Sequence, residues 1–349
     1  MGGYRDQGLG EAGAIDYGDR HFTCFQFDYD WRLNIVESAK ALEKFIQEKT
    51  RYVREETRAR YGIERETVQF DIVAHSMGGL VARYFLRYGS ADLPQDGTIP
   101  LPTWAGAPYI ENIIMIGTPN GGSLDSLQNL IEGYRPSFLY SRYSPAVIGT
   151  FISLYQMLPR KRHHSLLRSP GQEIADPFDV KLWENNGWGL ADPKEGNNLE
   201  KILPKVENPD ERRRMALTCL PRVLGQTRQF TKAMDVPAKS PENVHLFLVA
   251  GDAVSTKKTA RINPNGSIEI VAFGHGDGVV LRSSAMLDER QDLTAFDRLI
   301  SPINWSQMLF LFSDHLGLTK DHVFIDNILY FLLERLRNGL IKVDQSGVS

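Results

Sequence analysis

Cysteine is scarce in this chain, and long apolar runs are absent. The 349 residues include two cysteines, Cys24 and Cys219, which are too few for a disulfide framework and too far apart for a zinc-binding spacing. We expect both to be small, buried apolar side chains. The longest apolar runs, at 244–250 and 308–312, have the length of a strand and fall far short of the ~20 residues that span a bilayer. The pattern excludes an integral membrane protein built on helices.

No targeting pattern opens the chain. Residues 1–10 lack the apolar segment of a signal peptide, and Asp6 interrupts the myristoylation pattern that Met1 and Gly2 would begin. This favours a cytoplasmic or peripheral membrane location unless an upstream segment is missing.

Neither sign of charge dominates, and no repeat is visible. Forty Lys and Arg residues stand against 43 Asp and Glu residues, a formal net charge of -3, so we expect no nucleic-acid partner. The 30 glycines and 18 prolines are spread along the chain, which excludes collagen-like and low-complexity classes. Hydrophobic residues at 42% and charged residues at 24% are typical of a globular protein with a large core.

Strand-like and helix-like segments alternate along the chain. Short β-rich apolar runs predict strands at 22–27, 68–74, 110–116, 244–250 and 308–312. Apolar residues three and four apart predict helices at 35–61, 78–88 and 321–336, with Gly62 and Gly89 as stops. Because Ile110–Ile116 is almost unbroken aliphatic, it suits a central parallel strand. The alternation predicts an α/β fold with a mostly parallel sheet.

Between residues 125 and 243 the clean periodicity is lost. We predict an inserted cap or lid there, in a core made of residues 1–124 and 244–349. The aromatic stretch Tyr134–Leu158 either lines an acyl slot and meets a lipid surface or forms the core of the cap itself. The basic residues from Arg160 to Arg168 either meet anionic headgroups or form a solvated face.

The segment Ala74-His75-Ser76-Met77-Gly78-Gly79 stands where a predicted strand gives way to a predicted helix. This is the context of a nucleophile elbow, a tight strand-to-helix turn that exposes a serine. The turn strains the serine, and small residues at 74 and 78 let strand and helix approach. We predict Ser76 as a nucleophile and His75 as a residue that packs the elbow.

A serine nucleophile needs a base and an acid, which in hydrolases of this kind follow in the order Ser, Asp or Glu, His. His315 follows the strand predicted at 308–312, whereas His322 lies in the last helical pattern and is expected to be a surface or packing residue. For the acid, Asp277 in the glycine-rich segment 274–280 is favoured, and Asp252, directly after the strand at 244–250, is the alternative.

The segment Gly117–Ser123 resembles a phosphate loop only superficially. It lacks the lysine of a P-loop, and Pro119 removes a backbone N–H. We interpret it as a turn at the carboxyl edge of the sheet, where α/β proteins place their sites.

Four motifs together resemble the lecithin:cholesterol acyltransferase-like family of α/β-hydrolases, which includes phospholipid:diacylglycerol acyltransferases and lysosomal-type phospholipases. They are Tyr29-Asp30-Trp31-Arg32, the elbow at 74–80, Gly117-Thr118-Pro119, and Gly276–Val280 followed by His315-Leu316. The resemblance runs from about Phe22 to Leu336 and is loose through the cap. Trp31 and Arg32 either border the acyl site or brace their own loop, and we favour bracing.

The resemblance implies an α/β-hydrolase fold and a Ser76-Asp277-His315 triad that acts through an acyl-enzyme. The substrate would be a lipid ester, met at a membrane or lipid surface, and water or an acceptor alcohol would take the acyl group. The backbone N–H of Met77 would stabilise the oxyanion, and neither a cofactor nor a metal is implied. The alternative is a non-catalytic interaction protein on the same scaffold.

The second oxyanion donor of the family lies in a His-Gly or Pro-Gly loop upstream of the Tyr-Asp-Trp-Arg motif. Only 21 residues precede Phe22, and they contain neither an apolar strand nor such a loop; Gly8–Gly13 is the nearest glycine-rich stretch. Either the chain starts after the first core strand, or Gly8–Gly13 supplies the donor without its strand. We favour the first, an α/β-hydrolase that lacks its first core strand.

Overall fold

The centre of the molecule is a four-stranded parallel sheet. The computed structural model describes residues 24–135, 141–168, 173–290 and 298–334. The sheet has the order β1-β2-β4-β7, built from β1 (Phe70–His75), β2 (Ile110–Ile116), β4 (His245–Gly251) and β7 (Gln307–Leu311). Each neighbouring pair is parallel, and β2 and β4 lie inside. The predicted α/β class is confirmed.

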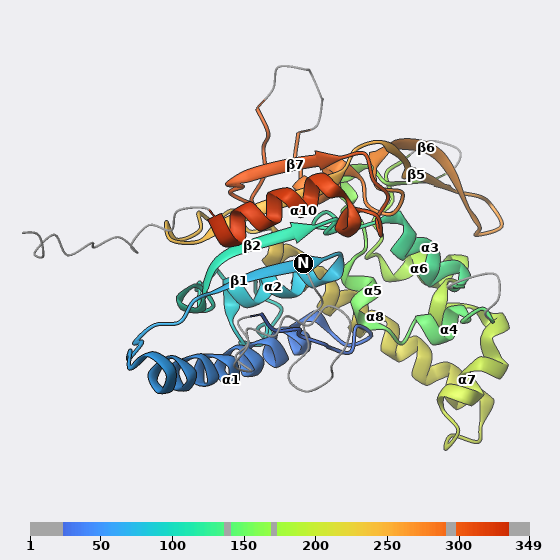
Figure 1. Cartoon of the computed structure of the whole chain (residues 1–349). Coiled ribbons are helices and arrows are strands. Elements are labelled where there is room, and N and C mark those ends of the chain that lie inside the picture. The colour runs from blue at the N-terminus through green and yellow to red at the C-terminus, as the bar shows by residue number, and fades with distance from the viewer. Residues whose placement is uncertain (1–23, 136–140, 169–172, 291–297, 335–349) are drawn as a thin grey trace, which may run out of the picture.

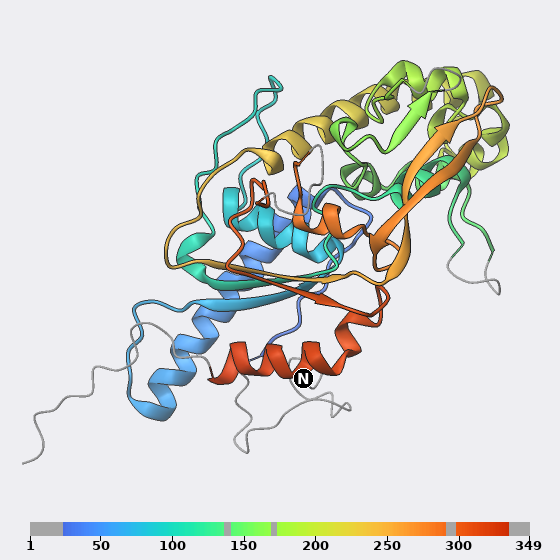
Figure 2. The same ribbon diagram turned by 90° about the horizontal axis from the view of Figure 1, so that it is seen from above.

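Helices cover the two faces of this sheet (Figures 1 and 2). The side chains of β2 alternate, so Ile113 and Met115 join one hydrophobic cluster while Ile114 and Ile116 join another. The first face is covered by α1 (Ile35–Tyr61) and α2 (Met77–Tyr88), and near β4 by α9 (Arg282–Met286). The second face is covered by α10 (His322–Leu329), which continues as a π-helical turn over Tyr330–Glu334.

Most elements predicted from the sequence are confirmed. Helix α1 has the expected bounds, and Gly62 ends it in the left-handed region at a φ of 66°. The helix predicted from residue 321 begins at His322 with Asp321 as its N-cap.

The strand predicted at 22–27 is wrong for the residues described, since 24–27 form no strand. Phe25 packs edge-on against Tyr52 and Phe70, and Phe27 packs against Phe45 of α1. These aromatic side chains fasten the segment to its neighbours without a backbone ladder. Within the described residues, β1 is therefore an edge strand of the sheet.

The segment from residue 124 to 243 is mainly helical. Its helices and strand are α3 (Leu124–Glu132), α4 (Pro145–Ile148), α5 (Ile152–Gln156), β3 (Leu166–Arg168), α6 (Val180–Asn186), α7 (Gly196–Ile202) and α8 (Pro209–Asp235). Single 3-10 turns are η1 (Ala107–Tyr109), η2 (Lys161–His163), η3 (Gly189–Ala191), η4 (Pro193–Glu195) and η5 (Leu318–Lys320). Strand β3 pairs with β5 (Val254–Ile262), which forms an antiparallel hairpin with β6 (Ile268–Gly276). The hairpin after β4 thus reaches across to β3.

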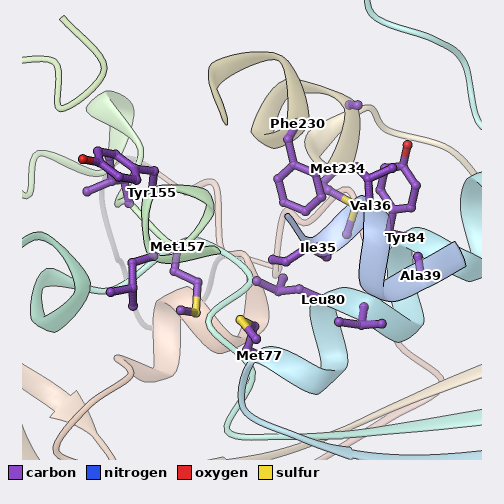
Figure 3. Packing of buried hydrophobic residues seen from close by; sticks show 14 of the residues in the cluster. Ile35, Val36, Ala39, Met77, Leu80, Tyr84, Tyr155, Met157, Phe230 and Met234 are labelled. Atoms are coloured by element: carbon purple, nitrogen blue, oxygen red, sulfur yellow. The ribbon is translucent and has the colours of Figure 1, made fainter. Parts of the chain in front are cut away.

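One hydrophobic cluster joins this segment to the helices beside the sheet (Figure 3). Met77 and Ile35 belong to it, as do Tyr155 and Met157 around α5 and Phe230 on α8. Within the aromatic stretch, Tyr155 is fully buried, which fits a core role, whereas Tyr143 is 49% exposed. Residues 136–140 of that stretch, among them Phe138, Leu139 and Tyr140, lie outside the described residues.

The basic residues after Pro159 are not a uniform solvated face. Arg160 is buried and forms an ion pair with Asp235, while Arg162 bridges Asp235 and Glu289. The carbonyl oxygens of Leu158 and Asn120 also accept hydrogen bonds from Arg160, so all three nitrogens of this guanidinium have partners inside the protein. Neither expectation for Arg160, headgroup contact or solvation, is correct.

The expectation that both cysteines are buried is wrong. Cys219 is exposed, because the buried face of α8 is formed by Ala216, Leu220 and Val223. Cys24 is half-buried. In the part of the chain that the structure describes, no helix is both long enough and apolar enough to span a membrane.

Candidate active site

Ser76 occupies a strained turn between β1 and α2. Its φ of 55° and ψ of -128° lie in a region that residues other than glycine rarely adopt. The turn is held because the N–H of Ser76 donates to Ile116 O at 2.7 Å and the N–H of Gly79 donates to Ser76 O at 3.1 Å. The predicted strand-turn-helix context and backbone strain are confirmed.

The closest packing behind the elbow is between Gly79 and Thr118. A Cβ at Gly79 would lie 2.0 Å from Thr118 Oγ1, whereas a Cβ at Gly78 would make ordinary contacts of 3.6 Å with Tyr29 Oη and 3.7 Å with Ala74 Cβ. The elbow motif predicts the tightest packing at positions 74 and 78. It does not predict the close packing at Gly79, because the neighbour Thr118 follows β2 and is distant in the sequence.

Ser76, His315 and Asp277 form a continuous hydrogen-bonded chain. Ser76 Oγ lies 3.0 Å from Nε2 of His315, and Nδ1 of His315 lies 2.8 Å from Oδ2 of Asp277. The carboxyl of Asp277 is almost fully buried, and its Oδ1 accepts the N–H groups of Val279 and Val280 at 2.9 and 2.7 Å. The N–H of His315 also donates to Asp277 O at 2.9 Å. Both oxygens of the carboxyl therefore have partners, which fixes its orientation.

Gly117 has no side chain, and this leaves room for the hydrogen bond between His315 and Asp277. A Cβ there would lie 3.0 Å from Asp277 Oδ2 and 3.1 Å from His315 Nδ1, and the φ of Gly117 is 56°. A side chain at this position would both strain the backbone and press on the hydrogen bond. Sequence reasoning identified the turn at the sheet edge but not this role; the only indication was a glycine directly after a buried strand.

Asp252 and His322, the alternative acid and base, lie apart from the hydrogen bonds that join Ser76, His315 and Asp277. Asp252, after β4, forms a two-pronged ion pair with Arg282, with Nη1 at 2.8 and 2.9 Å from the two carboxyl oxygens. His322 is exposed at the start of α10. Among the described residues, neither Asp252 nor His322 forms a hydrogen bond or ion pair with Ser76 or His315.

His75 supports the loop that carries His315. Its Nε2 lies 2.8 Å from His315 O, and the two rings are 4.7 Å apart between centroids. Because a carbonyl oxygen can only accept, Nε2 of His75 carries the proton. Burial lowers the pKa of His75 below its ordinary value.

Met77 is the first residue of α2, so its N–H lies at the helix end that favours negative charge. The alternative donor segment, Gly8–Gly13, lies outside the described residues.

In the Tyr29–Arg32 motif, Arg32 pairs with Asp30 and its hydrogen bonds lower the pKa of Asp30 to about 2. Trp31 meets Phe151 edge-on at 5.3 Å. These contacts fit bracing of the loop.

The parallel sheet and the strand-turn-helix elbow at Ser76 define an α/β-hydrolase fold. Residues 15–179, just under half of the chain, match the model of the lecithin:cholesterol acyltransferase family. The resemblance drawn from the motifs is thus confirmed for the segment that carries the elbow.

Two solved structures align with most of this chain at low sequence identity. A chain of the Tle4–Tli4 complex aligns with 81% of this chain at 15% identity and a TM-score of 0.48, and this chain spans 63% of its length. Lipase 1 from Pelosinus fermentans aligns with 77% of this chain and 72% of its own at 14% identity and a TM-score of 0.32. No curated protein sequence gives a significant match.

Proposed function

We propose that this protein is a serine-dependent acyl-transfer enzyme that acts on lipid esters, with Ser76 as nucleophile, His315 as general base and Asp277 as the orienting acid. The observation that carries the proposal is the chain of hydrogen bonds from Ser76 Oγ through His315 to Asp277. A base within hydrogen-bond reach of a strained, half-exposed serine is the geometry that nucleophilic catalysis requires.

In the first step, Ser76 Oγ attacks the ester carbonyl while Nε2 of His315 takes the hydroxyl proton. Asp277 accepts the hydrogen bond from Nδ1, which keeps the free lone pair on Nε2 and stabilises the imidazolium that forms. The negative charge that develops on the carbonyl oxygen is stabilised by the N–H of Met77 at the start of α2. His315 then gives the proton to the leaving alcohol, and an acyl-Ser76 ester remains.

In the second step, water or an acceptor alcohol attacks the acyl-Ser76 ester. His315 takes the proton of the attacking hydroxyl and returns a proton to Ser76 as the new acid or ester leaves. No group beyond these side chains is needed for the proton transfers. The substrate class, a lipid ester, rests on the family match over residues 15–179.

A fluorophosphonate probe tests the proposal directly on the purified chain. We expect covalent labelling at Ser76, and cleavage of at least one ester in a lipid-ester panel. Ser76→Ala should lose both. Ser90→Ala, at an exposed serine just beyond the end of the same helix, is the matched control and should lose neither.

Running the panel with and without an acceptor alcohol separates the two second steps. Free acid formed in water alone assigns hydrolysis, and a new ester formed with the alcohol assigns transfer. Undiminished labelling of Ser76→Ala would refute the assignment of the nucleophile. A folded chain that neither labels nor cleaves any ester would favour the non-catalytic interaction protein.

A further inference from the structure

Two arginines on α2 are buried without a carboxylate partner. Arg83 and Arg87 are 2% and 3% exposed. Arg83 donates to Asn120 Oδ1 at 2.6 Å and to Met234 O at 2.5 Å, and Arg87 donates to Val236 O at 2.6 Å. Among the described residues, no Asp or Glu lies within ion-pair distance of either guanidinium. Their hydrogen-bond partners are therefore neutral oxygens, and the guanidinium of Arg87 also lies over the rings of Tyr88 and Trp104, at 5.9 and 5.6 Å from the centroids.

The nearest buried anion is already neutralised. Asp235 accepts from both Arg160 and Arg162, and Arg162 also pairs with Glu289. The carbonyl groups that Arg83 and Arg87 contact belong to the end of α8, where the helix dipole supplies only about half a negative charge. Burial, followed by the charge of Arg87, lowers the pKa of Arg83 to about 9. An excess of positive charge is thus enclosed beside α2, which is costly without a counter-charge.

A small cavity lies against both arginines. It has a volume of about 10 Å³ and is also lined by Trp104, Ser240 and Asn304. This is room for one water-sized particle. Nε of Arg87 is buried and has no hydrogen-bond acceptor among the residues that the structure describes. Asn304 is exposed, so the cavity lies one residue away from solvent.

We propose that this cavity is a binding site for a single halide ion, chloride under ordinary conditions. A chloride ion is somewhat larger than a water molecule, so it enters this cavity only if the guanidinium groups of Arg83 and Arg87 move slightly apart, whereas a carboxylate or phosphate group is far too large. It would give Nε of Arg87 an acceptor and offset the charge of the two guanidinium groups. The site ties α2 to the end of α8, and it is independent of the chemistry proposed at Ser76.

The test is the halide dependence of thermal unfolding of the whole chain. At equal ionic strength, sodium chloride should raise Tm by about 2 °C over sodium gluconate, whose anion is too large for the cavity. Arg87→Met should abolish this difference. Arg222→Met removes an exposed arginine on α8 and should keep it. Crystals grown in bromide should show an anomalous peak between Arg83 and Arg87.

Equal Tm values in the two salts for the wild-type chain would overturn the proposal. So would a chloride effect that persists in Arg87→Met. Should Arg87→Met fail to fold, the bromide crystals of the wild-type chain decide, and the absence of an anomalous peak at this cavity would refute the site.

Discussion

The imidazole of His75 donates a hydrogen bond to the backbone carbonyl of His315, its neighbour across the elbow, at 2.8 Å. The backbone N–H of His315 is bonded in turn to the carbonyl of Asp277. Both backbone polar groups of His315 are therefore anchored, one beside the serine and one at the aspartate. This arrangement fixes the main chain of the proposed base as well as its ring.

Two substitutions of His75 should distinguish the contribution of its hydrogen bond to His315 from the contribution of its ring. His75→Phe leaves the His315 carbonyl without its donor, a cost of about 1–3 kcal/mol, and we expect kcat to fall roughly tenfold or more. His75→Gln keeps an N–H donor and should retain most of kcat. Steady-state kinetics on one ester substrate measures both variants. Equal losses in the two would contradict a role for the hydrogen bond.

The same histidine predicts an effect of pH on stability. Burial lowers the pKa of His75 below its ordinary value of 6.5. Just below pH 6.5, His75 therefore binds a proton in the unfolded chain but stays neutral in the folded chain. Stability contributed by neutral His75 is therefore lost as pH falls from 6.5 towards the folded pKa. Urea unfolding between pH 7.5 and 5 should show a smaller loss in His75→Gln than in the wild-type chain.

The two candidate acids should differ sharply. Asp277→Asn removes the carboxylate that fixes the His315 tautomer, and we expect kcat to fall ~10⁴-fold, as in other triads. Asp252 is engaged by Arg282, so Asp252→Asn should cost far less. His315→Ala should be as severe as Ser76→Ala because triad members act as a unit, while His322→Ala should be mild. The reverse order for the two aspartates would transfer the role to Asp252.

Two adjacent glycines offer a matched pair of substitutions. The Cβ of Gly79→Ala would overlap Thr118, so α2 must move away from β2, and we expect loss of activity together with a Tm lowered by several degrees. Gly78→Ala meets only ordinary contacts and should fold normally. Thermal unfolding and fluorophosphonate labelling of both variants test this, and a stable, fully reactive Gly79→Ala would show that the packing there is looser than described.

The ion pairs around Asp235 should make the molecule acid-sensitive. Burial opposes ionisation, but Arg160 and Arg162 hold the pKa of Asp235 below its usual value, and Arg162 and His163 lower the pKa of Glu289 to about 2. Stability from Glu289 is therefore full above about 4.5 and is lost as pH falls towards 2. At pH 7, Asp235→Asn leaves Arg160 unpaired and should cost about 3–5 kcal/mol. Urea unfolding of Asp235→Asn and Glu289→Gln against pH checks both statements.

Local patterns predicted local structure well. The bounds of α1 followed from its apolar spacing and from Gly62, and the elbow followed from a strand, a turn and a helix in succession. What the sequence could not supply was the partner of each side chain. Arg160 looked like part of a basic surface because Asp235 lies 75 residues away, and Asp252 remained an alternative until its pairing with Arg282 was known. Charge partners depend on the tertiary fold, which residue spacing does not encode.

Ser76 and His315 lie 239 positions apart in the sequence, so the ribosome synthesises them at different times. At roughly 5–20 residues per second, the ribosome makes the elbow about 12–48 s before the histidine. During that interval the nascent chain carries Ser76 without its proposed base. On the proposed function, a polypeptide stalled before residue 315 would therefore not react with esters, and reactivity of Ser76 would report chains in which β7 has joined the sheet.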